Sequence, residues 1–244
     1  MSESLQKHVF VPETELVFNE NFERDLIQHA HELLEGQRNC IGKGTTAEIH
    51  FIELNPKNCL KIISKRSGYS TVIPNGAGEL PTYHPLTVEA KFLEDLQGID
   101  SEVRVPRPLY VVTVVNEDEK TGAVEETSLL AMERFPGSSL RDVLENDVEL
   151  PKNFNPDVFF KKVRGFFEKM HGRNVHHRDA HEGNIMVGPE GEAFVIDFGC
   201  ATIDSIQEAY REERGRRIIT YKPDMERIDE VEHKIRKYLT RRAQ

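Results

Sequence analysis

The chain has 244 residues, 38% of them hydrophobic and 13 of them phenylalanine, so it can bury a sizeable core as one domain or as two small lobes. Its formal net charge of −10 argues against a general nucleic-acid binder, because neutralising phosphates requires a basic face. No run approaches the roughly 18 consecutive apolar residues of a membrane span, and the first residues lack the apolar core of a secretory signal. The chain has three cysteines, an odd number that does not suggest a disulfide framework. Together these features predict a protein of the reducing environment of the cytoplasm.

The first third of the chain predicts a helix followed by strands. Apolar residues recur at helical spacing over residues 20–34, in an extension that covers residues 1–39. Alternating residues up to position 54 and an apolar run at 59–63 then predict two antiparallel strands joined by a turn. Residues 64–85 are rich in Gly, Pro, Ser and Thr, which predicts a long insertion. This insertion is either a segment for partner docking or autophosphorylation or a loop of no consequence.

The rest of the chain predicts one more packed helix, two more strands and then mainly helices. A helix is expected over residues 87–97, and strands over 103–115 and 128–135. These elements predict a small, mostly antiparallel lobe over residues 40–135. A Pro-Gly pair follows, and helices are expected over 139–146, 157–171, 205–217 and 224–239. Residues 136–244 therefore form the helical lobe of an α+β protein.

The strongest chemical pattern lies in residues 177–199. Asp179 is followed five positions later by Asn184 and, after an apolar run, by Asp197 and a Phe-Gly pair. A carboxylate such as Asp179 can accept the proton of an attacking hydroxyl. The oxygens of Asn184 and Asp197 are hard ligands of the kind that Mg²⁺ prefers. The spacing predicts metal-assisted phosphoryl transfer from ATP, with His177 and Phe198 packing to hold the loop.

A zinc site is the alternative for this stretch, because His176, His177 and His181 lie close together in the sequence. Gly183 follows at once, however, and no cysteine or further histidine completes a tetrahedral ligand set. The zinc interpretation is therefore disfavoured.

A glycine-rich turn and a buried lysine precede this pattern. Gly42 and Gly44 would let backbone amides approach phosphate oxygens, although the turn alone also fits an ordinary hairpin. Lys61 lies in the apolar strand 59–63, where an ammonium group needs an acidic partner or a phosphate. Glu89 on the next helix is the best candidate. The alternatives are a lysine that reaches solvent at a strand edge and an exposed glutamate.

In their order and approximate spacing, these motifs resemble the protein-kinase-like superfamily over residues 40–199. The resemblance implies a bilobal fold with a small antiparallel-sheet N-lobe and a truncated helical C-lobe. It implies ATP and Mg²⁺ as cofactors, with Mn²⁺ as an alternative metal. In this family Lys61 would hold the phosphates and pair with Glu89. Asp179 would be the catalytic base, and Asn184 and Asp197 would bind the metal.

The resemblance also implies a set of nucleotide contacts. Met132 stands at the gatekeeper position, and Glu133 and Phe135 would offer backbone contacts to adenine. Cys59 stands where kinases usually have alanine, and core packing explains it and its neighbours equally well. The expected set comprises Ile41, Gly42, Gly44, Thr45 and Thr46 in the turn, with Ile49, Cys59, Lys61, Met132, Glu133, Phe135 and Met186.

Two departures concern the acceptor. His181 stands where serine/threonine protein kinases usually have lysine, so the His-x-Asp-x-His-x-x-Asn loop resembles aminoglycoside and choline phosphotransferases and ubiquinone-pathway atypical kinases. Few residues follow Gly199 and no Ala-Pro-Glu sequence is present. We therefore expect the large peptide-binding subdomain to be missing, as in RIO-type and minimal bacterial effector kinases.

The interpretation that follows is an atypical serine/threonine protein kinase that is cytoplasmic, or delivered to a host cell if it is a bacterial effector. A protein or small-molecule hydroxyl would be the acceptor, a regulatory protein is a further expected partner, and no nucleic acid is expected. The alternatives are a small-molecule, sugar or lipid kinase, and a pseudokinase or ATPase module.

Overall fold

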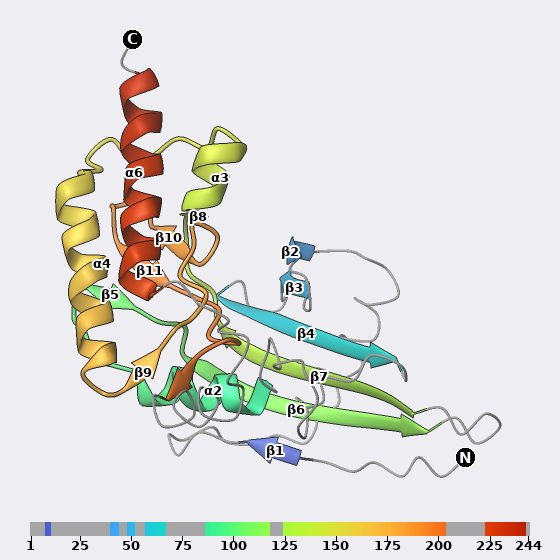
Figure 1. The fold of residues 1–244 in the computed structure, drawn as a ribbon. Coiled ribbons are helices and arrows are strands. Elements are labelled where there is room, and N and C mark those ends of the chain that lie inside the picture. The colour runs from blue at the N-terminus through green and yellow to red at the C-terminus, as the bar shows by residue number, and fades with distance from the viewer. Residues whose placement is uncertain are drawn as a thin grey trace, which may run out of the picture. The chain divides into compact units, whose positions relative to one another are not determined.

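The fold is seen in a computed structural model, which describes residues 8–10, 40–43, 48–51, 57–66, 86–117, 124–203 and 223–242 (Figure 1). The helices expected over 20–34 and 205–217, the turn residues Gly44, Thr45 and Thr46, and residues 67–85 of the expected insertion lie outside these ranges. The chain divides into two compact units. The first comprises Met1–Glu94 and Arg107–Arg134, and the second comprises Asp95–Pro106 and Phe135–Gln244.

The first unit is built on a six-stranded antiparallel sheet, as expected from the alternating segments. Each strand pairs with its neighbours in an unbroken ladder apart from two local register shifts. In spatial order the strands are β1 (His8–Phe10), β6 (Pro108–Glu117), β7 (Val124–Glu133), β4 (Asn58–Arg66), β3 (Glu48–Phe51) and β2 (Cys40–Lys43).

Strand β4 is longer than the sequence predicts. The expected strand ends at position 63, but β4 continues through Ser64, Lys65 and Arg66. The reason is the pairing with β7, whose ladder runs on as far as Arg66 opposite Glu125. Residues whose composition is typical of a loop are thus held in a strand by their hydrogen-bonded neighbour.

The single strand expected over residues 103–115 is in fact two strands. Val103–Arg104 forms β5, and β6 begins at Pro108. Pro106 lies between them and has no backbone N–H for a sheet ladder. The side chain of Gln97 donates to the Pro106 carbonyl at 3.1 Å. Strand β5 belongs to the second unit, where it pairs with Ala193–Val195.

Helix α2 (Leu86–Asp95) has a buried face at positions 86, 89, 90, 92 and 93, which is helical spacing. Four of these residues are apolar, and the fifth is Glu89. A carboxylate on the apolar face of a helix requires a specific partner, because burying an unpaired charge is costly.

The second unit contains three described helices and two small sheets (Figure 1). The four-stranded sheet has the order β5, β11 (Ala193–Val195), β10 (Ile185–Val187) and β8 (Ser138–Ser139). The two-stranded sheet pairs β12 (Thr202–Ile203) with β9 (Val175–His176). The helices are α3 (Leu140–Glu145), α4 (Pro156–His171) and α6 (Asp224–Arg242).

Local signals explain where α3 and α4 begin. Ser139 accepts from the amide of Asp142, and Asp142 accepts from the amide of Ser139, which is a capping box. Asn155 caps α4, and Pro156 occupies the first turn, where its missing N–H is not needed. The buried face of α4 is rich in phenylalanine and comprises Phe159, Phe160, Val163, Phe166, Phe167 and Met170.

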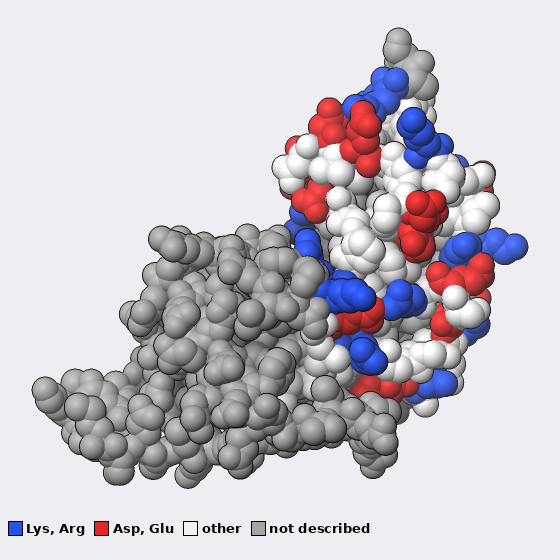
Figure 2. Space-filling model, turned by 180° about the vertical axis from the view of Figure 1, so that it is seen from behind, with Lys and Arg blue, Asp and Glu red and all other residues white. Residues whose placement is uncertain are grey.

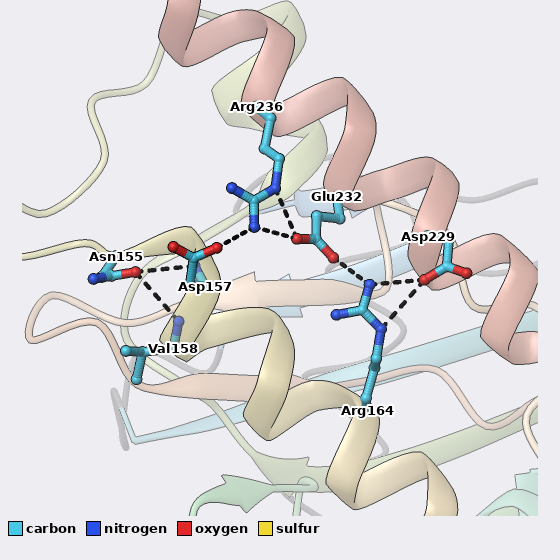
Figure 3. A network of polar contacts seen from close by, with 7 residues as sticks. All are labelled: Asn155, Asp157, Val158, Arg164, Asp229, Glu232 and Arg236. Atoms are coloured by element: carbon cyan, nitrogen blue, oxygen red, sulfur yellow. Dashed lines mark hydrogen bonds and ion pairs between the residues drawn. The ribbon is translucent and has the colours of Figure 1, made fainter.

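Helices α4 and α6 are joined by charged side chains (Figure 3). Arg164 donates to Asp229 at 2.7 Å and also to Glu232. Arg236 donates to Glu232 and to Asp157, so one network links the two helices. Among the described residues visible in Figure 2, basic and acidic side chains are interspersed. None of the described helices is both long enough and apolar enough to cross a membrane.

Candidate active site

Lys61 and Glu89 form a buried ion pair in the first unit. Lys61 Nζ lies 2.9 Å from Oε1 and 2.8 Å from Oε2 of Glu89. Lys61 is 4% exposed and Glu89 is 1% exposed. Each charge therefore compensates the other, since removing one partner would leave the other buried without it. The structure brings together the two residues that the sequence paired, and their role toward ATP stays a prediction.

The expected nucleotide contacts of the first unit lie on neighbouring strands. Ile41 and Gly42 are in β2, and Ile49 in β3 pairs in register with Lys61. Cys59 in β4 lies opposite Met132 in β7, and both side chains are buried. Burial raises the pKa of the Cys59 thiol to about 12 despite the opposing charge of Arg134. Cys59 therefore stays protonated and packs as a small apolar residue.

Some groups of the segment expected to contact adenine already make hydrogen bonds or ring contacts within the protein. The amide of Glu133 donates to the carbonyl of Arg107 at 2.9 Å, so Glu133 could contact adenine only through its carbonyl. In the second unit, the Phe135 ring stacks on Phe194 with 4.1 Å between centroids. The Phe135 side chain thus belongs to the core, which leaves its backbone for the expected contact. Met186 in β10 is half-buried.

The loop between β9 and β10 is held by His177. His177 Nδ1 accepts from the Asp179 amide at 3.3 Å, so the other nitrogen, Nε2, donates to the carbonyl of Ile196 at 3.0 Å. The buried ring also packs on Phe198, with 4.7 Å between centroids. His177 therefore ties the start of the loop to the segment that carries Asp197, through two hydrogen bonds and through packing on Phe198.

Asn184 holds Asp179 from the other end of the loop. Asn184 Nδ2 donates to the carbonyl oxygen of Asp179 at 2.9 Å and lies 3.3 Å from its Oδ2. Asn184 is buried, whereas Asp179 is partly exposed. With Nδ2 used in this way, the amide oxygen Oδ1 of Asn184 is the atom that can bind a cation.

The β10–β11 hairpin brings the residue before Asp197 against Asn184. Ile185 pairs with Val195, and the amide of Ile196 donates to the carbonyl of Asn184 at 3.0 Å. Asp197 then follows with φ 62°, in the left-handed region that Asp tolerates better than most residues. Oδ1 of Asn184 and the carboxylate of Asp197 are both hard oxygen donors. The residues present therefore fit Mg²⁺.

Asp224, at the start of α6, anchors the loop and was not recognised from the sequence. Its Oδ2 accepts from the His177 amide at 2.8 Å and from His171 Nε2 at 3.0 Å, while Oδ1 accepts from the Arg178 amide at 2.9 Å. Burial raises the pKa of this carboxyl, but these hydrogen bonds outweigh burial and hold the pKa below its ordinary value. Asp224 is thus an ionised acceptor for two consecutive loop amides.

Arg178 shows that the loop backbone is under constraint. It has φ 68°, which is uncommon for a residue other than Gly, Asn or Asp. Its amide is held by Asp224, and its Nε donates to Thr202 Oγ1 at 3.0 Å. These bonds stabilise a conformation that would otherwise be unfavourable.

The histidines of this region do not form a convincing zinc site. Candidate ligand atoms of His171, His176 and Asp224 lie within 4.8 Å of one another. However, the two rings are stacked with 4.5 Å between centroids and 21° between planes, so their in-plane lone pairs do not converge on one ion. His177 uses both nitrogens in the loop, and His181 Nδ1 accepts from the Gly183 amide at 2.9 Å. The described structure therefore does not bring His176, His177 and His181 together as the ligands of one zinc ion.

Sequence comparison finds short similarities to plant protein kinases. A 74-residue stretch is 30% identical to mitogen-activated protein kinase kinase 2 of Arabidopsis thaliana and covers 30% of this chain and 20% of that protein. A 108-residue stretch is 28% identical to CBL-interacting serine/threonine-protein kinase 16 of the same plant and covers 44% of this chain and 23% of that protein. The chain thus spans about a fifth to a quarter of these relatives.

Among solved structures, the chain is similar to a protein in the crystal structure of the yeast RNA Pol II CTD kinase CTDK-1 complex. The match has 18% identity and a TM-score of 0.39, and it covers 66% of this chain and 44% of the other.

A family match covers more of the chain than either plant kinase. The description of that family is "ABC1 atypical kinase-like domain", and residues 85–231 match it. These residues include Glu89 and the whole loop from His177 to Asp197. The α+β fold predicted from the sequence is confirmed as kinase-like, and the chain belongs to the ABC1 atypical kinase-like domain family.

Proposed function

We propose that this chain is an ATP- and Mg²⁺-dependent phosphotransferase, most simply an atypical serine/threonine protein kinase. The observation that carries the proposal is the loop geometry of the second unit. Asp179 is partly exposed, and Asn184 fixes it through a backbone and a side-chain contact. Two hard oxygen donors, from Asn184 and Asp197, follow at the spacing that metal-assisted phosphoryl transfer uses.

In the proposed reaction Asp179 acts as the base. The acceptor oxygen forms a bond to the γ-phosphorus of ATP, the bond from that phosphorus to the leaving oxygen of ADP breaks, and the hydroxyl proton passes to Asp179. Asn184 and Asp197 would hold Mg²⁺, which when bound neutralises charge on the phosphates. Catalysis then depends mainly on positioning, because the protein supplies little covalent chemistry.

The buried Lys61–Glu89 pair supports the proposal independently. An ion pair in an apolar interior is rarely a gain in stability over apolar residues of similar size. A lysine that must hold phosphates explains why a charge is kept there, with Glu89 fixing its direction. Lys61 would bind the α- and β-phosphates.

The proposal is tested by ATP turnover and acceptor labelling. The purified chain is incubated with Mg²⁺ and ATP, alone and with protein, amino-sugar and choline acceptors, and ADP and phosphorylated products are measured. We expect Asp179→Ala to lower turnover roughly 10²- to 10⁴-fold, the usual contribution of a general base. Asp197→Ala should abolish Mg²⁺-dependent transfer.

Replacement of Glu149 by alanine is the matched control, because it removes an exposed carboxylate that is not part of the 177–199 segment. It should leave turnover unchanged. Transfer by Asp197→Ala at the wild-type rate would refute the metal role. ATP binding without turnover on any acceptor would indicate a pseudokinase, and ADP release without acceptor phosphorylation would indicate an ATPase.

A further inference from the structure

The imidazole ring of His181 lies between a backbone amide and the side chain of Asp179. Its Nδ1 accepts from the Gly183 amide at 2.9 Å. Its other nitrogen, Nε2, lies 3.5 Å from Asp179 Oδ2. The ring therefore connects the middle of the loop to the carboxylate that the proposed reaction uses as its base.

The contacts to Nδ1 determine which ring nitrogen carries the proton. The Gly183 amide is a donor, and the guanidinium of Arg141 is also a donor, with Nη2 3.4 Å from Nδ1. Both require Nδ1 to accept, so the neutral ring carries its proton on Nε2. The Nε2 proton then faces Asp179.

The surroundings fix the position of the ring. A Cβ atom at Gly183 would lie 2.8 Å from His181 Cε1 and 3.0 Å from Arg141 Cζ, so only glycine leaves room for this packing. The loop is also tied to two helices. The amide of Arg141 donates to the carbonyl of Glu182 at 2.9 Å, and Lys234 of α6 lies 3.1 Å from the Glu182 carboxylate.

The contacts of the Asp179 carboxylate in the described part of the chain fall on one oxygen. Oδ2 is 3.3 Å from Asn184 Nδ2 and 3.5 Å from His181 Nε2. Both nitrogens are hydrogen-bond donors, and they belong to residues that precede and follow Gly183 in the sequence. A carboxylate held through Oδ2 presents Oδ1 to an incoming hydroxyl. The distance to Nε2 is long for a hydrogen bond, and catalytic contacts are often long before the substrate binds.

We propose that His181 is a positioning residue for Asp179, and that its Nε2–H holds Oδ2 so that Oδ1 takes the proton of the acceptor. This inference rests on the proposed function, in which Asp179 is the base. It assigns His181 a role within the enzyme rather than a contact to ATP. A phosphate-binding residue at this place would change the affinity for ATP, whereas a residue that orients the base changes the rate after ATP is bound.

Kinetics of three variants test this role. His181→Leu removes the donor and should lower kcat roughly ten- to a hundredfold with little change in the KM for ATP. His181→Gln keeps a side-chain N–H and should recover much of the loss. Gly183→Ala keeps the histidine but displaces its ring, so it should resemble His181→Leu. His233→Leu, at an exposed position of α6, is the matched control and should change neither kcat nor the KM for ATP.

Several kinetic results would overturn the proposal. His181→Leu could retain the wild-type kcat, its whole effect could fall on the KM for ATP, or His181→Gln could be as slow as His181→Leu. Thermal melting of each variant separates a folding defect from a kinetic one. The wild type and Asp179→Ala, measured in the same series, report on the proposed function by itself.

A spectroscopic measurement tests the contact without any turnover. Imidazole nitrogen NMR shifts should identify His181 as the neutral tautomer with its proton on Nε2. Asp179→Ala should shift the Nε2 resonance of His181 and leave that of the exposed His233 in place. A proton on Nδ1, or a His181 resonance that does not respond to Asp179→Ala, would refute the inference even if the chain transfers no phosphate.

Discussion

Replacing Asp224 by asparagine should destabilise the second unit, because it removes a carboxylate that accepts three hydrogen bonds. The carboxylate accepts from the amides of His177 and Arg178 and from His171 Nε2. Asparagine can accept through one oxygen only and would turn its NH₂ group toward a second donor. Hydrogen bonds to a charged group contribute about 1.5–3 kcal/mol each, so we expect a loss of about 2–4 kcal/mol.

Urea unfolding followed by circular dichroism measures this loss. The matched control is Asp229→Asn, because Asp229 is 65% exposed and pairs with Arg164 at the surface. That change should cost no more than about 1 kcal/mol. If Asp224→Asn is as stable as Asp229→Asn, the Asp224 carboxylate does not anchor the loop.

The pH dependence of the same variant provides a second check. The folded-state pKa of Asp224 is below its ordinary value. Its contribution to stability is therefore complete above the unfolded pKa of about 3.9 and is lost as the pH falls through the lower folded value. The stability difference between wild type and Asp224→Asn should be constant near neutral pH and should shrink below about pH 4. A difference that grows with acidity would contradict this sign.

Further predictions concern a buried charge and two glycines. Glu89→Leu should cost about 3–5 kcal/mol because it leaves the Lys61 ammonium buried without its carboxylate, and adding Lys61→Met should recover most of that stability in melting curves. Gly137→Ala should cost about 2–4 kcal/mol, because φ is 112° and a Cβ would collide with the Val187 carbonyl. Gly165→Ala, inside α4 with open space around the new methyl, should instead raise stability by about 0.5–1 kcal/mol. Equal melting temperatures for the two glycine variants would refute this contrast.

The sequence predicted the elements whose signals are local. Helix α4 follows from its helical apolar pattern and the proline in its first turn, and the Lys61–Glu89 pair follows from a charge inside an apolar strand. The signals for α4 are local, whereas Glu89 lies 28 positions after Lys61 and was chosen because it stands on the apolar side of the next helix and because the kinase resemblance implies the pair. The chemistry of Asp179 and Asn184 was likewise visible because the two residues are five positions apart.

Features that depend on distant pairing were not predictable in the same way. Strand β5 pairs with β11, some 90 residues later, and no local pattern distinguishes it from the start of β6. The extra length of β4 depends on β7 in the same manner. Asp224 reads in sequence as an ordinary acidic residue at the start of a helix, since its partners lie more than 40 residues earlier.

The sequence indicated that His181 is unusual but not which groups its ring contacts. Its place two residues after Asp179 marked a departure from most serine/threonine protein kinases. Its contacts with Gly183 and Arg141 needed the folded loop, because they involve the direction of a ring and the absence of a Cβ atom.

The most direct test of the central claim is ATP turnover by the wild type and Asp179→Ala, measured as ADP release and as the intact mass of the chain and of added acceptors. We expect Mg²⁺-dependent phosphoryl transfer by the wild type and a loss of roughly 10²-fold or more in Asp179→Ala, with both proteins folded and binding ATP. Equal rates of transfer by the two proteins would contradict the role of Asp179 as the base.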